Sequence, residues 1–86
     1  MEKYIKYNIN NENHRFSLLI VEPWAEEYNI HDIKSIDIYI YYEIFGEIYK
    51  YTVDNMIIIG LWSGCFAHIY YENIKFDDKF LINKVP

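Results

Sequence analysis

The residues best suited to chemistry in this chain of 86 residues are one cysteine and three histidines. Cys65 and His68 are closely spaced, in a C-x-x-H pattern, whereas His14 and His31 lie far from them in the sequence. On a β-strand, residues three apart point to opposite faces, so Cys65 and His68 are not placed to share a metal ion or to act as nucleophile and base. We therefore expect no metal site, no cofactor and no catalytic residues, in a protein that is not an enzyme.

The charge of the chain is concentrated in one third of the sequence. The formal net charge is −5. Residues 22–47 contain seven acidic residues and one lysine, a local charge of −6, and the rest of the chain has six acidic and seven basic residues. An acidic chain with a single arginine is unsuited to binding nucleic acid. The acidic third instead predicts attraction to a basic protein surface.

Hydrophobic residues recur with a period of two, which predicts β-strands. The clearest example runs from Ile36 to Phe45, where isoleucines alternate with acidic residues and tyrosines. Turn signals separate such segments at spacings typical of small antiparallel sandwiches and barrels. We expect one all-β domain, residues 1–86, folded as a small antiparallel β-sandwich or barrel of about 6–8 strands. The predicted strands are 4–9, 15–22, 36–45, 47–53, 56–62, 65–71, 74–76 and 80–82.

Polar and glycine-containing segments between these strands predict the turns. The strands on either side of Phe45-Gly46-Glu47 are expected to form a hairpin. A short helical turn is predicted at 23–28, because Pro23 suits the first position of a helix and the acidic pair at 26–27 suits its first turn. Further turns are predicted at Asn10–Asn13, Asp54–Asn55, Ser63–Gly64, Glu72–Asn73 and Asp77–Asp78.

The outward face of the clearest strand is the candidate binding site. Tyrosine offers a rigid apolar ring with one polar tip and is common at interface hot spots, and carboxylates steer association with a cationic partner. The predicted contact residues on this face are Asp37, Tyr39, Tyr41 and Glu43. Three residues of the preceding segment are predicted at its rim: Trp24, Glu26 and Glu27.

The start of the chain and its cysteine content indicate a cytoplasmic protein. No positively charged region precedes an apolar segment, so no signal peptide is predicted. The longest apolar run, from Met56 to Trp62, is too short to span a bilayer. A lone cysteine fits a reducing compartment. We expect no membrane association.

The segment from Val21 to Tyr28, Val-Glu-Pro-Trp-Ala-Glu-Glu-Tyr, resembles a signature of small bacterial all-β proteins. The resemblance extends over most of residues 18–76, including the turn at 54–55 and the strands after it. The resembling proteins carry glycine where this chain has Ala25. The signature implies a β fold and no catalytic residue. Compact acidic chains of this size are also similar in kind to immunity proteins of contact-dependent growth inhibition, which neutralise secreted bacterial toxins.

These features predict an immunity protein that binds a basic toxin domain, of the nuclease type, and blocks it by steric occlusion and acidic charge complementarity. Two alternatives remain open. Trp24 and exposed tyrosines are suited to a small carbohydrate-binding β module. A strand with an exposed tyrosine-rich face is also suited to a homo-oligomeric structural protein.

Overall fold

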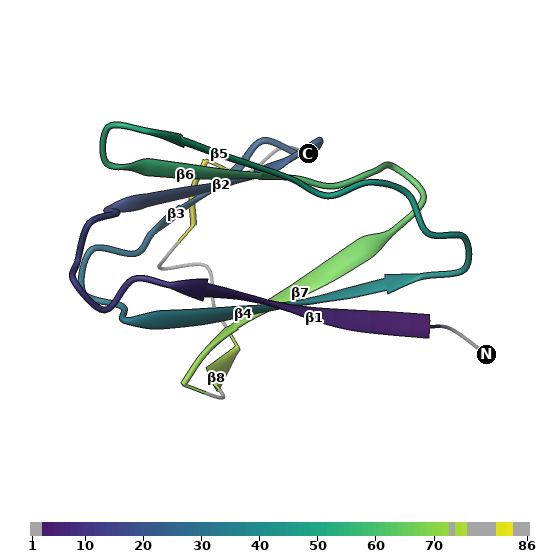
Figure 1. The fold of residues 1–86 in the computed structure, drawn as a ribbon, viewed down its shortest axis with the longest axis horizontal. Coiled ribbons are helices and arrows are strands. Elements are labelled where there is room, and N and C mark those ends of the chain that lie inside the picture. The colour runs from purple at the N-terminus through teal and green to yellow at the C-terminus, as the bar shows by residue number, and fades with distance from the viewer. Residues whose placement is uncertain (1–2, 73, 76–80, 84–86) are drawn as a thin grey trace.

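The fold is a sandwich of two β-sheets, seen as an upper and a lower layer in Figure 1. The computed structural model describes residues 3–72, 74–75 and 81–83. Sheet A has the strand order β1-β4-β7-β8 and sheet B the order β5-β6-β2-β3-β9. The strands are β1 (Lys3–Asn10), β2 (Leu18–Glu22), β3 (Glu26–Asn29), β4 (Ser35–Tyr42), β5 (Tyr49–Val53), β6 (Met56–Gly60), β7 (Phe66–Tyr71), β8 (Ile74–Lys75) and β9 (Leu81–Asn83).

Aliphatic side chains from both sheets form the core between the layers. The alternation predicted for the central strand of sheet A is confirmed, because Ile36, Ile38 and Ile40 are fully buried. Leu19 and Ile59 face them from sheet B. The predicted all-β sandwich is therefore confirmed, since the described strands form two separate sheets and not one closed barrel.

The connection between β4 and β5 corrects the predicted hairpin around Phe45-Gly46-Glu47. The two strands belong to different sheets, and residues 43–48 cross from one layer to the other. Gly46 packs directly under the Trp62 indole, since a Cβ atom at this position would lie 2.3 Å from Trp62 Cγ. The glycine thus allows a close approach of backbone to ring, and it does not form the turn of a hairpin.

The pairing within sheet B also departs from the expected antiparallel arrangement. β2 and β6 pair in parallel, with Leu19 opposite Ile57 and Val21 opposite Ile59. The crossing at 43–48 explains this, because it delivers the hairpin of β5 and β6 to the far side of β2. Figure 1 shows this hairpin stacked beside β2 in the upper layer.

The helical turn predicted at 23–28 is wrong. Residues 23–25 form a tight turn after a cis Glu22–Pro23 peptide, and Glu26 already begins β3, which pairs with β2. Ala25 has a φ of 54°, in the left-handed region that favours glycine, and glycine is the residue at this position in the resembling signature.

No described residue is helical, and none of the described part could cross a membrane as a helix.

The remaining predicted turns have mixed outcomes. Those at Asp54–Asn55 and Ser63–Gly64 are confirmed, and Glu72 is also in a turn. The turn predicted at Asp77–Asp78 lies outside the described residues.

The turn predicted at Asn10–Asn13 is present at residues 12–13, but Asn11 just before it lies at the centre of a buried hydrogen-bonding network. Its side chain is fully buried. The Nδ2 group donates to the carbonyl oxygens of Phe16 at 2.9 Å, Ile30 at 3.2 Å and Ile33 at 2.9 Å. Its Oδ1 accepts from the Phe16 backbone N–H at 2.9 Å. Asn11 thus joins the loop after β1 to the loop between β3 and β4 and closes that end of the sandwich.

Candidate functional site

Aromatic side chains from three adjacent strands share the outer face of sheet A. Directly opposed residues of paired strands lie on the same face. The register therefore sets Tyr41 between Tyr4 and Phe66, and sets Tyr39 next to His68. Tyr70 is opposite Asp37. We call this surface the aromatic face; its members are Tyr4, Tyr39, Tyr41, Phe66, His68 and Tyr70.

The rings of the aromatic face form one continuous network. Tyr41 stacks on Phe66 with 5.2 Å between ring centroids, and it lies 5.6 Å from Tyr4 and from His68. Tyr39 extends the network, at 6.1 Å from Tyr4 and 5.4 Å from Tyr70. Tyr4 is 60% exposed and Phe66 46% exposed, while the other members are half-buried. The network gives the outer face of sheet A a large apolar surface, with hydroxyl groups at the tips of the tyrosine rings.

Two of the predicted contact residues, Tyr39 and Tyr41, thus lie together as expected, and the structure adds partners from β1 and β7. Sequence reasoning missed these partners because strand pairing across the chain is needed to place them. Alternation within each strand did indicate which face they occupy, since Phe66, His68 and Tyr70 occupy every second position of β7.

The aromatic face carries less negative charge than the sequence suggested. Lys6 Nζ lies 3.7 Å from a carboxylate oxygen of Asp37, and Asn8 Nδ2 donates to the same carboxylate at 2.8 Å. Lys6 also lies 6.0 Å from the centroid of the Tyr39 ring. Asp37 is on the predicted face, but Lys6 offsets its charge.

Glu43 is not on the strand face where it was predicted. β4 ends at Tyr42, and Glu43 lies exposed at the start of the crossing to sheet B. There it lines a hollow together with Phe45 and Trp62. The alternation of β4 therefore stops one residue too early for Glu43 to join Tyr39 and Tyr41.

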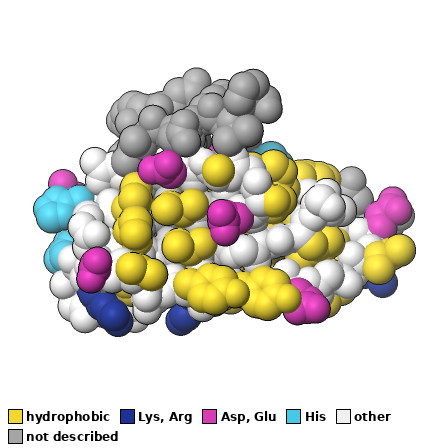
Figure 2. Space-filling view, turned by 90° about the horizontal axis from the view of Figure 1, so that it is seen from above, with side chains coloured by type: hydrophobic (Ala, Val, Ile, Leu, Met, Phe, Trp, Pro, Cys, Tyr) yellow, Lys and Arg dark blue, Asp and Glu magenta, His cyan; other side chains and the backbone are white. Residues whose placement is uncertain are grey.

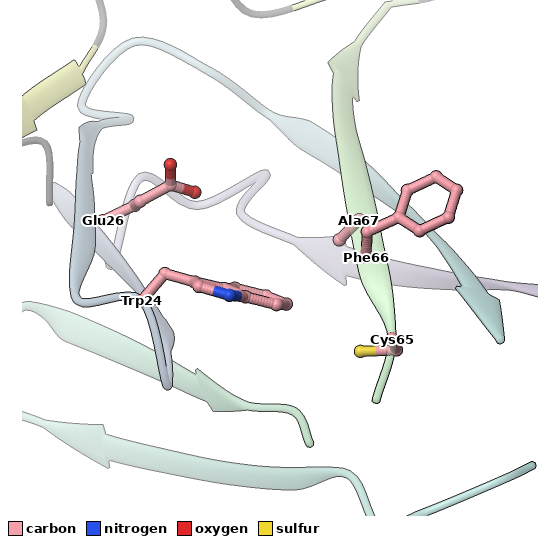
Figure 3. Close-up of a pocket in the computed structure, with 5 residues that line it drawn as sticks. All are labelled: Trp24, Glu26, Cys65, Phe66 and Ala67. Atoms are coloured by element: carbon pink, nitrogen blue, oxygen red, sulfur yellow. The ribbon is translucent and has the colours of Figure 1, made fainter. Parts of the chain in front are cut away.

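Trp24 and Glu26 were predicted at the rim of the aromatic face, but they lie on the side of β7 that faces sheet B. They line a hollow of about 230 Å³ with Cys65, Phe66 and Ala67. In Figure 3 the side chains of Cys65 and Ala67 point toward the Trp24 ring, whereas that of Phe66 points away from it. The Phe66 ring therefore belongs to the aromatic face, on the other side of β7 from Trp24. Trp24 is half-buried and packs against the core.

Glu27 does not lie at the rim of the aromatic face either. It is opposite Ile20 in the pairing of β2 with β3, whereas Glu26 is opposite the buried Val21. Since opposed residues share a face, Glu27 lies on the outer side of sheet B. The acidic third of the sequence is therefore divided between several surfaces.

Sheet B has an outer face of a different character. Figure 2 shows it from above, with hydrophobic side chains gathered over it and acidic side chains among them. Ile20 and Ile58 are paired at its centre and are half-buried, and Tyr51 is opposite Ile58 and 54% exposed. Tyr49 stacks on Tyr51 with 6.2 Å between ring centroids. Because this surface also carries exposed tyrosines, variants on it can serve as controls for variants on the aromatic face.

Cys65, just before β7, and His68 within it lie on opposite sides of sheet A, as predicted. Cys65 is buried and donates from Sγ to the Trp62 carbonyl at 3.0 Å, while His68 is part of the aromatic face. Burial raises the pKa of the Cys65 thiol, so the nucleophilic thiolate is disfavoured at neutral pH. Among the described residues, no group of three or more potential metal ligands comes together.

The arrangement thus offers binding surfaces: a ring network on sheet A, a hollow beside Trp24 and a hollow beside Trp62. No known family model, no curated protein and no solved structure matches the chain.

Proposed function

We propose that this protein is an immunity protein that binds a basic bacterial toxin domain, of the nuclease type, through the aromatic face of sheet A. The observation that carries the proposal is the exposed ring network centred on Tyr41. An exposed cluster of large apolar rings on a small domain is typical of a protein–protein contact surface.

The composition of the face suits a tight complex. Tyrosine contributes large contact area while few side-chain torsions are immobilised, and its hydroxyl can bond at the edge of the contact. Tyr39 and Tyr41 are already held by neighbouring rings, so little further ordering is required on binding. The flat sheet would cover the toxin surface and occlude its active site.

The net charge of −5 supports a basic partner. The substrate-binding surface of a nuclease is positively charged because it contacts phosphates. An acidic chain is attracted to such a surface and competes with the phosphate backbone for it. Since Lys6 offsets Asp37, the rings supply most of the affinity and the net charge mainly accelerates association.

The ring geometry favours a protein over a carbohydrate. A sugar ring stacks on the open face of an aromatic side chain. Tyr41 and Phe66 stack on each other with only 14° between their planes, so each covers a face of the other. The ring surface that remains exposed, with hydroxyl groups among the rings, suits the side chains of a protein surface.

The charge contribution is tested by Asp37→Asn, which removes the carboxylate charge and keeps the size of the side chain. With a purified basic toxin domain as the titrant, calorimetric titration at low salt should show affinity reduced about threefold, because Lys6 already offsets part of the Asp37 charge, and the difference should shrink as salt is added. Glu12→Gln is the matched control, because Glu12 lines a hollow with Lys50 and Thr52 of sheet B and should leave affinity unchanged. Equal affinity of Asp37→Asn and the wild type at low salt would show that the Asp37 charge does not contribute to binding.

A further inference from the structure

The hollow beside Trp62 lies at the end of β4, where the chain crosses from sheet A to sheet B. Its volume is about 440 Å³, which is ample for one long side chain. The crossing segment contributes one side and the segment after β6 the other. The lining residues are Glu43, Ile44, Phe45, Gly46, Trp62 and Gly64.

The walls of this hollow are aromatic and unusually exposed. Phe45 lies 5.1 Å from Trp62 and 5.5 Å from Tyr42 between ring centroids, and Tyr42 lies 5.7 Å from Trp62. Ile44 is 84% exposed and Phe45 is 54% exposed. Large apolar side chains that are exposed beside a cluster of packed rings indicate a contact surface.

Two glycines line the hollow. No side chain fits at Gly46, because its Cβ would collide with the Trp62 ring. At Gly64 a Cβ would lie 3.4 Å from Trp62 Cδ1, close to contact. Neither glycine adds a side chain that would fill the space beside the indole.

The rim of the hollow is acidic. Glu43 is exposed, and no described lysine or arginine forms an ion pair with it. None of the described residues that line the hollow is basic. A carboxylate beside aromatic rings is a combination that binds organic cations, through charge at one end and the ring quadrupole along the walls.

We infer that this hollow receives an arginine side chain of the partner protein, with the guanidinium group at Glu43 and the aliphatic stem along Ile44 and Phe45. The inference rests on the proposed function, in which the partner is basic. Arginine fits better than lysine because its planar guanidinium both stacks on aromatic rings and pairs with a carboxylate through two hydrogen bonds. A buried arginine is also among the commonest interface hot spots.

The test uses the small peptide acetyl-Gly-Arg-Gly-amide and its citrulline analogue, which has the same shape without the charge. The reporter is the indole N–H resonance of Trp62, a buried group without a hydrogen-bond partner among the described residues. Trp24 supplies the second indole resonance as an internal control, and Trp24→Phe assigns the two. The arginine peptide should shift the Trp62 resonance with a Kd on the order of 1–10 mM, and the citrulline peptide should bind at least about fivefold more weakly.

Glu43→Gln should weaken binding of the arginine peptide about fivefold, whereas Glu47→Gln should not. Glu47 is a matched control because it loses the same charge nearby, and its carboxylate accepts from the Tyr49 hydroxyl. Equal binding of the two peptides, equal effects of the two variants, or no Trp62 shift up to about 50 mM peptide would each overturn the inference.

Failure of this inference and failure of the proposed function give different results. Toxin binding that depends on the aromatic face, without an arginine response at Trp62, rejects the hollow alone. An arginine response at Trp62, in a protein whose binding to the toxin domain is absent, rejects the proposed function alone.

Discussion

Asn11→Ala should lower the free energy of unfolding by about 3–5 kcal/mol, a large part of the stability of a domain of this size. The substitution removes every side-chain hydrogen bond of a fully buried residue. The Phe16 N–H and the Ile33 carbonyl then lose the Asn11 side chain as their partner, whereas the Ile30 carbonyl still accepts from the Ile33 N–H at 3.0 Å. Each buried backbone group without a partner costs about 1–3 kcal/mol. Urea denaturation followed by circular dichroism measures the change.

Asn13→Ala is the matched control for this variant. Asn13 is exposed in the same loop, and its side chain accepts from the Arg15 N–H at 3.4 Å, a long contact. The control should change stability by less than about 0.5 kcal/mol. A loss below about 1 kcal/mol for Asn11→Ala would mean that the loops do not depend on this side chain.

Tyr41→Ala should reduce affinity for the toxin domain about 100-fold, as expected for a central interface hot spot. Tyr41 is the hub of the aromatic face, in ring contact with Tyr4, Phe66 and His68. Its removal deletes its own contact area and releases three neighbouring rings. The backbone of β4 is held between β1 and β7, so the fold should persist at reduced stability. Calorimetric titration measures the affinity, and circular dichroism verifies folding.

Tyr51→Ala provides the comparison on the other sheet. Tyr51 is equally a strand tyrosine, exposed and stacked on a neighbour, but it lies on the outer side of sheet B. Its loss should leave affinity within about threefold of the wild type. If Tyr51→Ala weakened binding more than Tyr41→Ala, the outer face of sheet B would be the binding surface instead.

The sequence was most informative for features that depend on a single strand, such as the face on which each side chain lies. The strict alternation of β4 placed Ile36, Ile38 and Ile40 in the core and Tyr39 and Tyr41 outside, because side chains on a strand alternate between faces. The local turn chemistry at Asp54–Asn55 was equally reliable, since a two-residue connection depends on its own residues.

Features that depend on distant residues could not be predicted in this way. Lys6 and Asp37 are far apart in the sequence, so the neutralisation of Asp37 became visible only with the register of β1 and β4. The same holds for Asn11. It lies in a polar segment typical of an exposed turn, and yet its side chain is buried by loops from other parts of the chain.

The crossing at 43–48 was missed for a related reason. Glycine occurs both in tight turns and where a backbone passes close to a ring, and the local sequence does not separate these cases. Only the position of Trp62 shows that Gly46 serves the second purpose. The displaced Glu43 and the aromatic hollow both follow from that crossing.

The central claim is that the aromatic face of sheet A contacts the partner, and fluorine NMR of the protein labelled with 3-fluorotyrosine tests it most directly. Tyrosine-to-phenylalanine variants assign the resonances of Tyr4, Tyr39 and Tyr41 on the aromatic face and of Tyr49 and Tyr51 on sheet B. On addition of the basic toxin domain, the first three resonances should shift and broaden, and those of Tyr49 and Tyr51 should stay in place. Shifts at Tyr49 and Tyr51, with the three resonances of the aromatic face unchanged, would contradict the account.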